Sequence, residues 1–159
     1  MIYWFIGQPG SGKTTLAKEF KKYVNCFGQQ RSIHLDGDDL RAIFKSGYTP
    51  DVLTPEYRKE QTRALQRLVA YLADQDIPVI VSTVNGYRDV REEFKQSRSD
   101  VVEIYVTKSE DRGRENFNIP SFEDPNWDYI SIDTDFNTVE ESLAELTQKI
   151  EDRAMLLAT

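Results

Sequence analysis

Residues 2–15 read IYWFIGQPGSGKTT, and this stretch decides the fold because it joins a short strand to a complete phosphate-binding motif. The largely apolar residues 2–6 predict a buried strand, and the spacing Gly-x-x-x-x-Gly-Lys-Thr follows it at once. Glycines let the backbone turn its N–H groups inward, Lys13 can reach the outer phosphates, and Thr14 can hold a magnesium ion. A chance glycine-rich turn is disfavoured, because the full spacing occurs where a strand must turn into a helix. The expected contacts to a nucleoside triphosphate are Gly7, Gly10, Ser11, Gly12, Lys13, Thr14 and Thr15.

The composition limits the classes of protein to consider. A chain of 159 residues and 18.4 kDa suits one domain that spans residues 1–159. The formal net charge of −7 argues against broad binding to nucleic acid or to an anionic membrane. A single cysteine excludes an internal disulfide, and the N-terminus has neither a charged leader nor an apolar span. We therefore expect a cytoplasmic protein without nucleic-acid or membrane partners.

Short apolar runs alternate with longer helical patterns, which is typical of a parallel sheet with crossover helices. Strands are expected near residues 2–6, 32–36, 77–83, 101–107 and 128–133. Helices are expected near residues 13–24, 38–44, 55–73, 87–96 and 139–154, the last capped by Asn137 or Thr138. The pattern predicts one doubly wound α/β unit, a five-stranded parallel sheet flanked by helices with ligands at the carboxyl ends of the strands.

A second informative segment, residues 33–41, reads IHLDGDDLR. Asp36 ends a strand beside the phosphate loop, where a carboxylate can orient a substrate hydroxyl or hold magnesium through water. Arg41 can pair with an anionic substrate in bidentate fashion. For Asp38 and Asp39 an equal alternative is that one of them only caps a helix.

Several arginines lie where an anionic substrate would need them. Arg41, Arg58 and Arg88 each lie near the carboxyl end of a strand or the start of the helix beside it. The arginines at 63, 67 and 91 are expected to form an ordinary solvated helix face.

Other residues favour structural interpretations. His34 is expected to be a packed or edge residue rather than a base, and Cys26 a small buried apolar residue. Trp4 and Trp127 are expected to pack in or against the core.

Taken together, the motifs resemble the adenylyl-sulfate kinases, P-loop kinases that phosphorylate the ribose 3′-hydroxyl of adenosine 5′-phosphosulfate with MgATP. The segments that carry the resemblance are residues 7–15, LDGDDLR at 35–41, YRKEQ at 57–61, VSTVNGYR at 81–88 and ENF at 115–117. The phosphate loop is shared by many enzymes, whereas the Asp-Gly-Asp-x-Leu-Arg segment is much more specific. The resemblance implies a P-loop kinase fold, ATP and Mg²⁺ as cofactors, and a homodimer as a candidate assembly.

The resemblance also implies roles for individual residues. Asp36, helped by Asp38, would assist the attacking hydroxyl, while Arg41 and Arg58 would grip the phosphosulfate group. The implied catalytic set is Lys13, Asp36 and Asp38, and the implied metal ligands are Thr14 and Asp36. In the short lid, Arg112 or Arg114 can restore a cation, with Arg112 packed on the ATP adenine, and an equal alternative is that both are solvated loop charges. The implied acceptor-binding set is Asp36, Asp38, Arg41, Arg58, Gln61, Val84, Arg88 and Phe117, the last stacked on the substrate adenine.

Three departures from the family pattern leave the acceptor open. Asn85 replaces the family's serine that was proposed as a phosphorylated intermediate, so phosphoryl transfer is expected to be direct and in line. Leu53 replaces a second aromatic residue that lies across the adenine, with Tyr48 or Tyr57 as substitutes. The lid, about residues 108–127, is shorter than the family's. The alternatives are a P-loop kinase of another nucleoside, sugar or polynucleotide hydroxyl, or a nucleotide-binding protein that has lost transfer activity.

Overall fold

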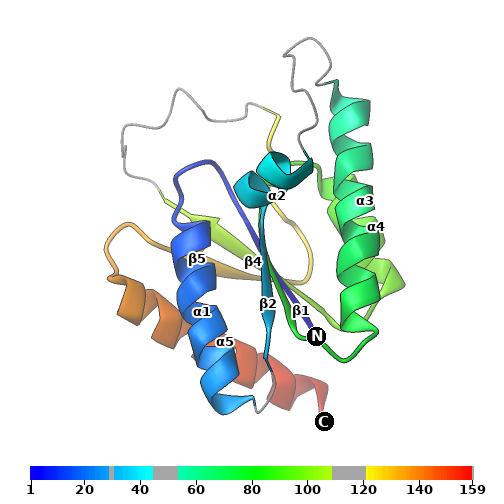
Figure 1. Ribbon diagram of the computed structural model, residues 1–159. Helices are drawn as coiled ribbons and strands as arrows, with labels where there is room; N and C mark the ends of the chain where they lie inside the picture. Colours follow the sequence, from blue (N-terminus) through cyan, green and yellow to red (C-terminus); the bar gives the residue numbers. More distant parts are fainter. Residues whose placement is uncertain (29–30, 45–53, 109–120, 159) are drawn as a thin grey trace.

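Five parallel strands form one sheet in the order β2-β3-β1-β4-β5 in the computed structural model, which describes residues 1–28, 31–44, 54–108 and 121–158 (Figure 1). The strands are β1 (Ile2–Ile6), β2 (Ile33–Asp36), β3 (Val79–Ser82), β4 (Val101–Thr107) and β5 (Tyr129–Asp133). Every neighbouring pair is parallel. The predicted doubly wound, five-stranded parallel sheet is therefore confirmed.

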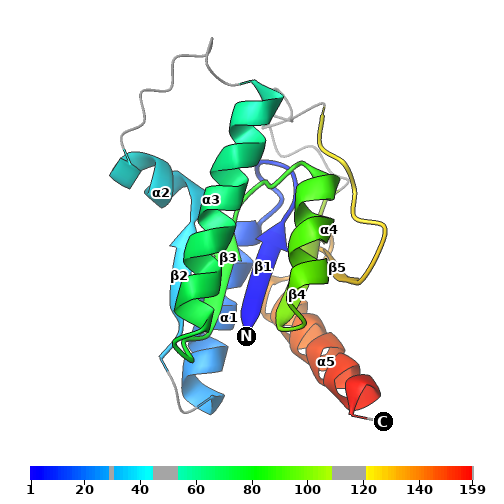
Figure 2. The ribbon, with the colours of Figure 1, turned by 90° about the vertical axis from the view of Figure 1, so that its right-hand side faces the viewer.

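Helices cover both faces of this sheet. They are α1 (Lys13–Phe27), α2 (Gly37–Phe44), α3 (Pro55–Ala73), α4 (Arg88–Ser97) and α5 (Val139–Leu157). Helices α1 and α5 pack on one face, and α3 and α4 pack side by side on the other (Figure 2). None of the helices in the described part of the chain is both long enough and apolar enough to cross a membrane.

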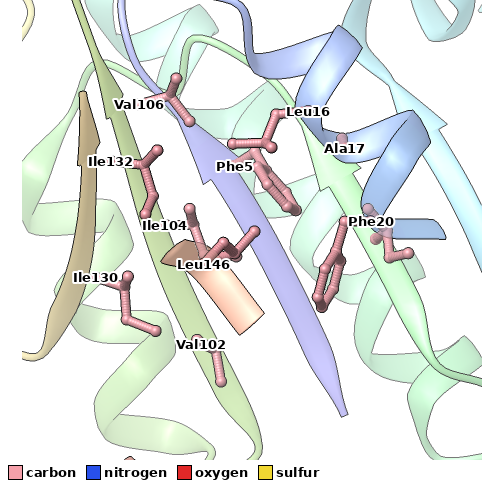
Figure 3. Packing of buried hydrophobic residues seen from close by; sticks show 11 residues of the cluster. Phe5, Leu16, Ala17, Phe20, Val102, Ile104, Val106, Ile130, Ile132 and Leu146 are labelled. Carbon is pink, nitrogen blue, oxygen red and sulfur yellow. The ribbon is translucent and has the colours of Figure 1, made fainter. Parts of the chain in front are cut away.

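Strand β1 lies in the middle of the sheet and sends alternate side chains to two apolar layers. Phe5 joins Phe20 of α1 and Leu146 of α5 in the layer of Figure 3. Ile2 and Trp4 join residues of α3 and α4 in the opposite layer. Burying a large apolar side chain stabilises the fold by about 1.5–3 kcal/mol. The two layers thus hold β1 rigidly, and the loop that follows it starts from a fixed point.

The starts of α3 and α5, both predicted, have side-chain caps. Thr54 accepts a hydrogen bond from the backbone N–H of Tyr57 at 3.2 Å. Thr138 forms a capping box with Glu141, so Thr138 rather than Asn137 is the cap of the last helix.

The expectation for Cys26 was wrong, because this cysteine is exposed. Helix α1 continues to Phe27, beyond the expected end at residue 24, and its last residues, 25–27, are exposed. Trp4 is 3% exposed, whereas Trp127 is 48% exposed and packs its ring against Lys95. Trp127 is therefore a packing residue outside the core.

Candidate active site

The phosphate loop has the backbone that its glycines predict. Gly7, Gly10 and Gly12 have φ angles of 144°, 79° and 94°. A Cβ atom on Gly7 would lie 2.2 Å from the carbonyl oxygen of Val106, so no other residue fits there. Gly12 caps α1 without a side-chain hydrogen bond, which leaves the first N–H groups of the helix to bind an anion.

Lys13 is buried at the base of this loop. Its side chain is 8% exposed, and Nζ donates to the carbonyl oxygen of Gln8 at 2.7 Å. Burial lowers the pKa of Lys13 to about 8, against the opposing attraction of Asp36. The ammonium group therefore still carries its charge at neutral pH, next to the place where phosphates would bind.

Asp36, the last residue of β2, is 7% exposed and forms hydrogen bonds to both the phosphate loop and the neighbouring strand β3. Its Oδ2 accepts hydrogen bonds from Thr14 Oγ1 at 2.7 Å and from Ser82 Oγ at 2.6 Å. Burial raises the pKa of Asp36, but the hydrogen bonds from Ser82 and Thr14 outweigh burial and hold the pKa below its ordinary value. Asp36 is therefore an ionised, oriented carboxylate beside the phosphate loop.

Ser82 also belongs to this site, although its place in the sequence indicates no role for it. The parallel register of β2 and β3 pairs Asp36 with Ser82, so the two side chains meet at the same edge of the sheet. His34 Nε2 lies 2.8 Å from Ser82 Oγ, and burial lowers the pKa of this histidine. The lone histidine is thus a hydrogen-bonded residue of the edge strand β2, as expected.

The first turn of α2 shows which aspartate caps this helix. The backbone N–H of Asp38 donates to Asp36 Oδ1 at 2.9 Å, so Asp36 caps α2. Neither Asp38 nor Asp39 is the cap, because both follow the first helical residue, Gly37. The Asp38 carboxylate is 82% exposed and pairs with Arg41 one turn later.

A cavity of about 790 Å³ lies beside Asp36, between α2, α3 and the loop after β3. Gly37, the neighbour of Asp36, and Thr83, the neighbour of Ser82, both line it. The floor includes Trp4, whose indole N–H donates to Thr83 Oγ1 at 2.8 Å. The predicted acceptor residues that line this cavity are Arg41, Arg58, Gln61 and Val84.

The arginines differ in what they contact. Among the described residues, the Arg58 guanidinium at the cavity wall has no carboxylate partner. Arg88 does not line the cavity, and its Nε donates to the carbonyl oxygen of Asp124 at 2.7 Å. Arg63 and Arg67 pair with glutamates on the surface, as expected.

The expectation that Arg91 is solvated was wrong. Its side chain is 3% exposed, and its Nε lies 2.6 Å from Oε1 of Glu103. Residue 91 lies on the side of α4 that faces the sheet, where Glu103 of β4 neutralises its charge.

Several predicted contacts lie outside the described residues. They are Arg112 and Phe117, together with Leu53 and Tyr48 at the second aromatic position.

The donor set near Asp36 fits a magnesium ion shared with a triphosphate. Thr14 Oγ1 and Asp36 Oδ2 are hard oxygen donors 2.7 Å apart, and Mg²⁺ usually takes one or two protein oxygens, substrate phosphates and water. In the part of the chain that the structure describes, no group of three or more His, Cys, Asp or Glu side chains could hold a metal ion by itself. An ion here would therefore depend on the nucleotide for most of its ligands.

Comparisons with known proteins agree with this arrangement. The family model for adenylylsulphate kinase matches residues 1–116. The adenylyl-sulfate kinase of Staphylococcus carnosus is 28% identical to this chain, and the match covers 98% of this chain and 86% of the relative. The adenylyl-sulfate kinase of Halothermothrix orenii is also 28% identical, and the match covers 96% of this chain and 90% of the relative. The solved APS kinase CysC of Mycobacterium tuberculosis, in complex with AMPPNP and APS, superposes with a TM-score of 0.77 at 19% identity and covers 94% of this chain and 96% of that chain. The chain belongs to the adenylylsulphate kinase family.

Proposed function

We propose that this protein transfers the γ-phosphoryl group of ATP to the 3′-hydroxyl of adenosine 5′-phosphosulfate, giving 3′-phosphoadenosine 5′-phosphosulfate and ADP. Family membership supports the kinase reaction. The observation that carries the proposal is the position of Asp36, hydrogen-bonded to Thr14 of the phosphate loop and adjacent to Gly37 of a cavity that Arg41 and Arg58 line. One carboxylate thus stands between a site for a triphosphate and a site for a second anion.

On the donor side, the loop amides and Lys13 hold the β- and γ-phosphates of ATP. Thr14 and Asp36, together with the ATP oxygens, would hold Mg²⁺, which would supply neutralisation of the charge that develops on the phosphates. Because Gly7, Gly10 and Gly12 already have the positive φ angles that turn the loop N–H groups inward, these donors are oriented before the substrate binds.

On the acceptor side, Arg41 and Arg58 pair with the phosphosulfate, while Gln61 and Val84 line the same cavity. Asp36 accepts the hydrogen bond of the ribose 3′-hydroxyl and takes its proton as the oxygen attacks the γ-phosphorus. The bond to the β,γ-bridging oxygen breaks on the opposite side, and ADP leaves. Catalysis in this scheme comes from positioning and charge neutralisation. Stacking of Phe117 on the acceptor adenine and of Arg112 on the ATP adenine are further parts of the proposal.

The test is a direct product assay with purified protein, MgATP and adenosine 5′-phosphosulfate, with mass spectrometry to identify the nucleotide formed. Adenosine 5′-phosphate, a nucleoside, gluconate and a 5′-hydroxyl oligonucleotide serve as matched acceptors. The proposal expects a 3′-phosphorylated product from the phosphosulfate and much slower reaction with the others.

Preferential phosphorylation of one of the other acceptors would contradict the proposed substrate. Binding of both nucleotides by calorimetry without any phosphorylated product would instead favour a binding protein that has lost transfer.

A further inference from the structure

Three charged side chains are buried together on the face of the sheet that α4 covers. Glu103 of β4 and Arg91 of α4 are each 3% exposed, and Lys95 is 7% exposed. One oxygen of the Glu103 carboxylate pairs with Arg91 Nε at 2.6 Å, and the other pairs with Lys95. A buried ion pair is stable only when its remaining polar atoms are also hydrogen-bonded.

Those remaining donors hold backbone carbonyl groups of two irregular segments. Arg91 Nη1 donates to the carbonyl oxygen of Asn85 at 2.6 Å, and Nη2 donates to that of Glu123 at 2.5 Å. Lys95 Nζ donates to the carbonyl oxygens of Trp127 at 2.6 Å and Asp128 at 3.3 Å. Buried carbonyls outside helices and strands need such donors, because no strand or helix partner satisfies them.

The two cations hold different backbone segments. Asn85 lines the cavity of about 790 Å³ that the proposed function assigns to the acceptor, here called the acceptor cavity, and so do Gly86 and Ser121. The backbone N–H of Glu123 donates to the carbonyl oxygen of Gly86 at 2.9 Å, so the two segments that Arg91 holds are also bonded to each other. Lys95, in contrast, holds residues 127–128, which lead into β5 and do not line the cavity.

Arg91 contacts the backbone of Asn85, a residue in an unusual conformation. Asn85 has a φ angle of 47°, a left-handed conformation that asparagine tolerates better than most residues but that still needs support from its surroundings. The Arg91 guanidinium supplies that support from behind the cavity wall, and it also lies 5.6 Å from the centre of the Phe122 ring.

We propose that Arg91 is a positioning residue for the acceptor: from its buried pair with Glu103 it fixes the backbone of Asn85 and Glu123, and thereby the wall of the acceptor cavity. Arg91 does not line the cavity and acts through this backbone. This inference rests on the proposed function in one respect: the KM for adenosine 5′-phosphosulfate is used to measure the effect of changes in the cavity wall.

The chain offers a matched control for this idea. Arg91→Gln leaves Glu103 paired with Lys95, and Lys95→Gln leaves Glu103 paired with Arg91, so each variant keeps one buried ion pair. Both variants are expected to lower the melting temperature. Only Arg91→Gln is expected to raise KM for the phosphosulfate, by roughly tenfold, since small misplacements of a binding wall are costly. KM for ATP should stay within about twofold in both variants, because the phosphate loop is untouched.

Arg91→Lys keeps the charge but has a single donor group in place of the planar fork, so it should give a smaller rise in KM. This variant also keeps the test valid if Arg91→Gln folds poorly. An equal rise in KM for the Arg91 and Lys95 variants would overturn the proposal, as would an unchanged KM in Arg91→Gln.

Hydrogen exchange separates this inference from the proposed function. Amides of residues 83–87 and 121–124 should exchange faster in Arg91→Gln than in the parent protein, and should keep their protection in Lys95→Gln. If the parent protein does not phosphorylate adenosine 5′-phosphosulfate, the proposed function fails, yet this exchange comparison still decides whether Arg91 holds the wall. Equal loss of protection in both variants would show a general loss of stability and would overturn the inference.

Discussion

The phosphate loop is one contiguous segment, residues 7–15, whereas the acceptor cavity is assembled from α2, α3, the loop after β3 and Ser121, which lie far apart in the chain. Within the loop, positive φ angles at glycines and the start of α1 define the geometry locally. Along the cavity, the backbone of Asn85 is held by Arg91 from α4 and that of Gly86 by Glu123. The donor half therefore depends mainly on the glycine conformations of one segment, with a long-range hydrogen bond from Thr134 Oγ1 to the carbonyl oxygen of Ser11 at 2.9 Å. The acceptor half depends on contacts between distant segments, so substitutions should separate the two halves.

The largest effect is expected from Lys13→Ala in the donor half. In the proposed mechanism this buried cation holds the β- and γ-phosphates, so its loss should lower kcat by about 10³-fold, comparable to removal of a main electrostatic stabiliser. Lys22→Ala is the control, because Lys22 lies on the same helix but is 71% exposed and pairs with Glu19 on the surface. Steady-state kinetics that show more than a tenth of the parent kcat in Lys13→Ala would contradict this role.

Asp36→Asn tests the residue where the two halves meet. The amide keeps the size of the side chain but cannot take the proton of the acceptor hydroxyl, so kcat should fall by about 10²-fold while KM for the acceptor changes little. Asp39→Asn is the control, since Asp39 is exposed in the first turn of α2. An unchanged kcat in purified Asp36→Asn would remove Asp36 from the mechanism.

Two glycines allow the same comparison for stability. A Cβ atom at Gly7 would lie 2.2 Å from a backbone oxygen and would force alanine into a φ angle of 144°. A Cβ atom at Gly86, in the acceptor wall, would meet its nearest neighbour at 3.5 Å, an ordinary contact. Denaturant unfolding should show that Gly7→Ala lowers the free energy of unfolding by roughly 2–4 kcal/mol and Gly86→Ala by less than about 1 kcal/mol. Equal losses would mean that the acceptor wall is as tightly constrained as the loop.

This difference explains what the sequence could predict. The spacing that identifies Lys13 and Thr14 is local, and Asp36 is recognisable because it ends a strand beside that loop. Ser82 lies opposite Asp36 only through the register of β2 and β3, which no single segment encodes. Arg91 belongs to a helix face whose periodicity resembles a solvated one, and only its contact with Glu103 of β4 reveals that it is buried. Cys26 was misjudged because the exposed last turn of α1 continues past its expected end.

A smaller effect is expected from Arg58→Ala in the acceptor half. Arg58 lines the cavity and has no carboxylate partner in the described part of the chain, so its charge is available to an anionic acceptor. Its removal should raise KM for the phosphosulfate by about tenfold, with a lesser change in kcat. Arg67→Ala, on the exposed side of the same helix and paired with Glu60, should leave both constants unchanged. Matching changes in the two variants would indicate a general surface-charge effect instead.

The smallest effect should appear at Asp128, at the far end of the segment that Arg91 and Lys95 hold. Arg153 donates to its carboxylate at 2.5 and 2.9 Å, and these hydrogen bonds hold the pKa of Asp128 below its ordinary value. A carboxylate with a lowered pKa in the folded state adds stability that is complete above its unfolded pKa, about 3.9, and is lost as pH falls through the folded pKa.

Asn should tolerate the φ angle of 51° at residue 128, so Asp128→Asn mainly removes the charge. Thermal unfolding at neutral pH should therefore show a loss of at most about 1 kcal/mol, and the stabilities of the two proteins should converge as pH falls through the lowered pKa of Asp128. KM for the acceptor should not change, because residue 128 does not line the cavity. A change in that constant would mean that the acceptor wall extends as far as β5, and the separation between the roles of Arg91 and Lys95 would then be lost.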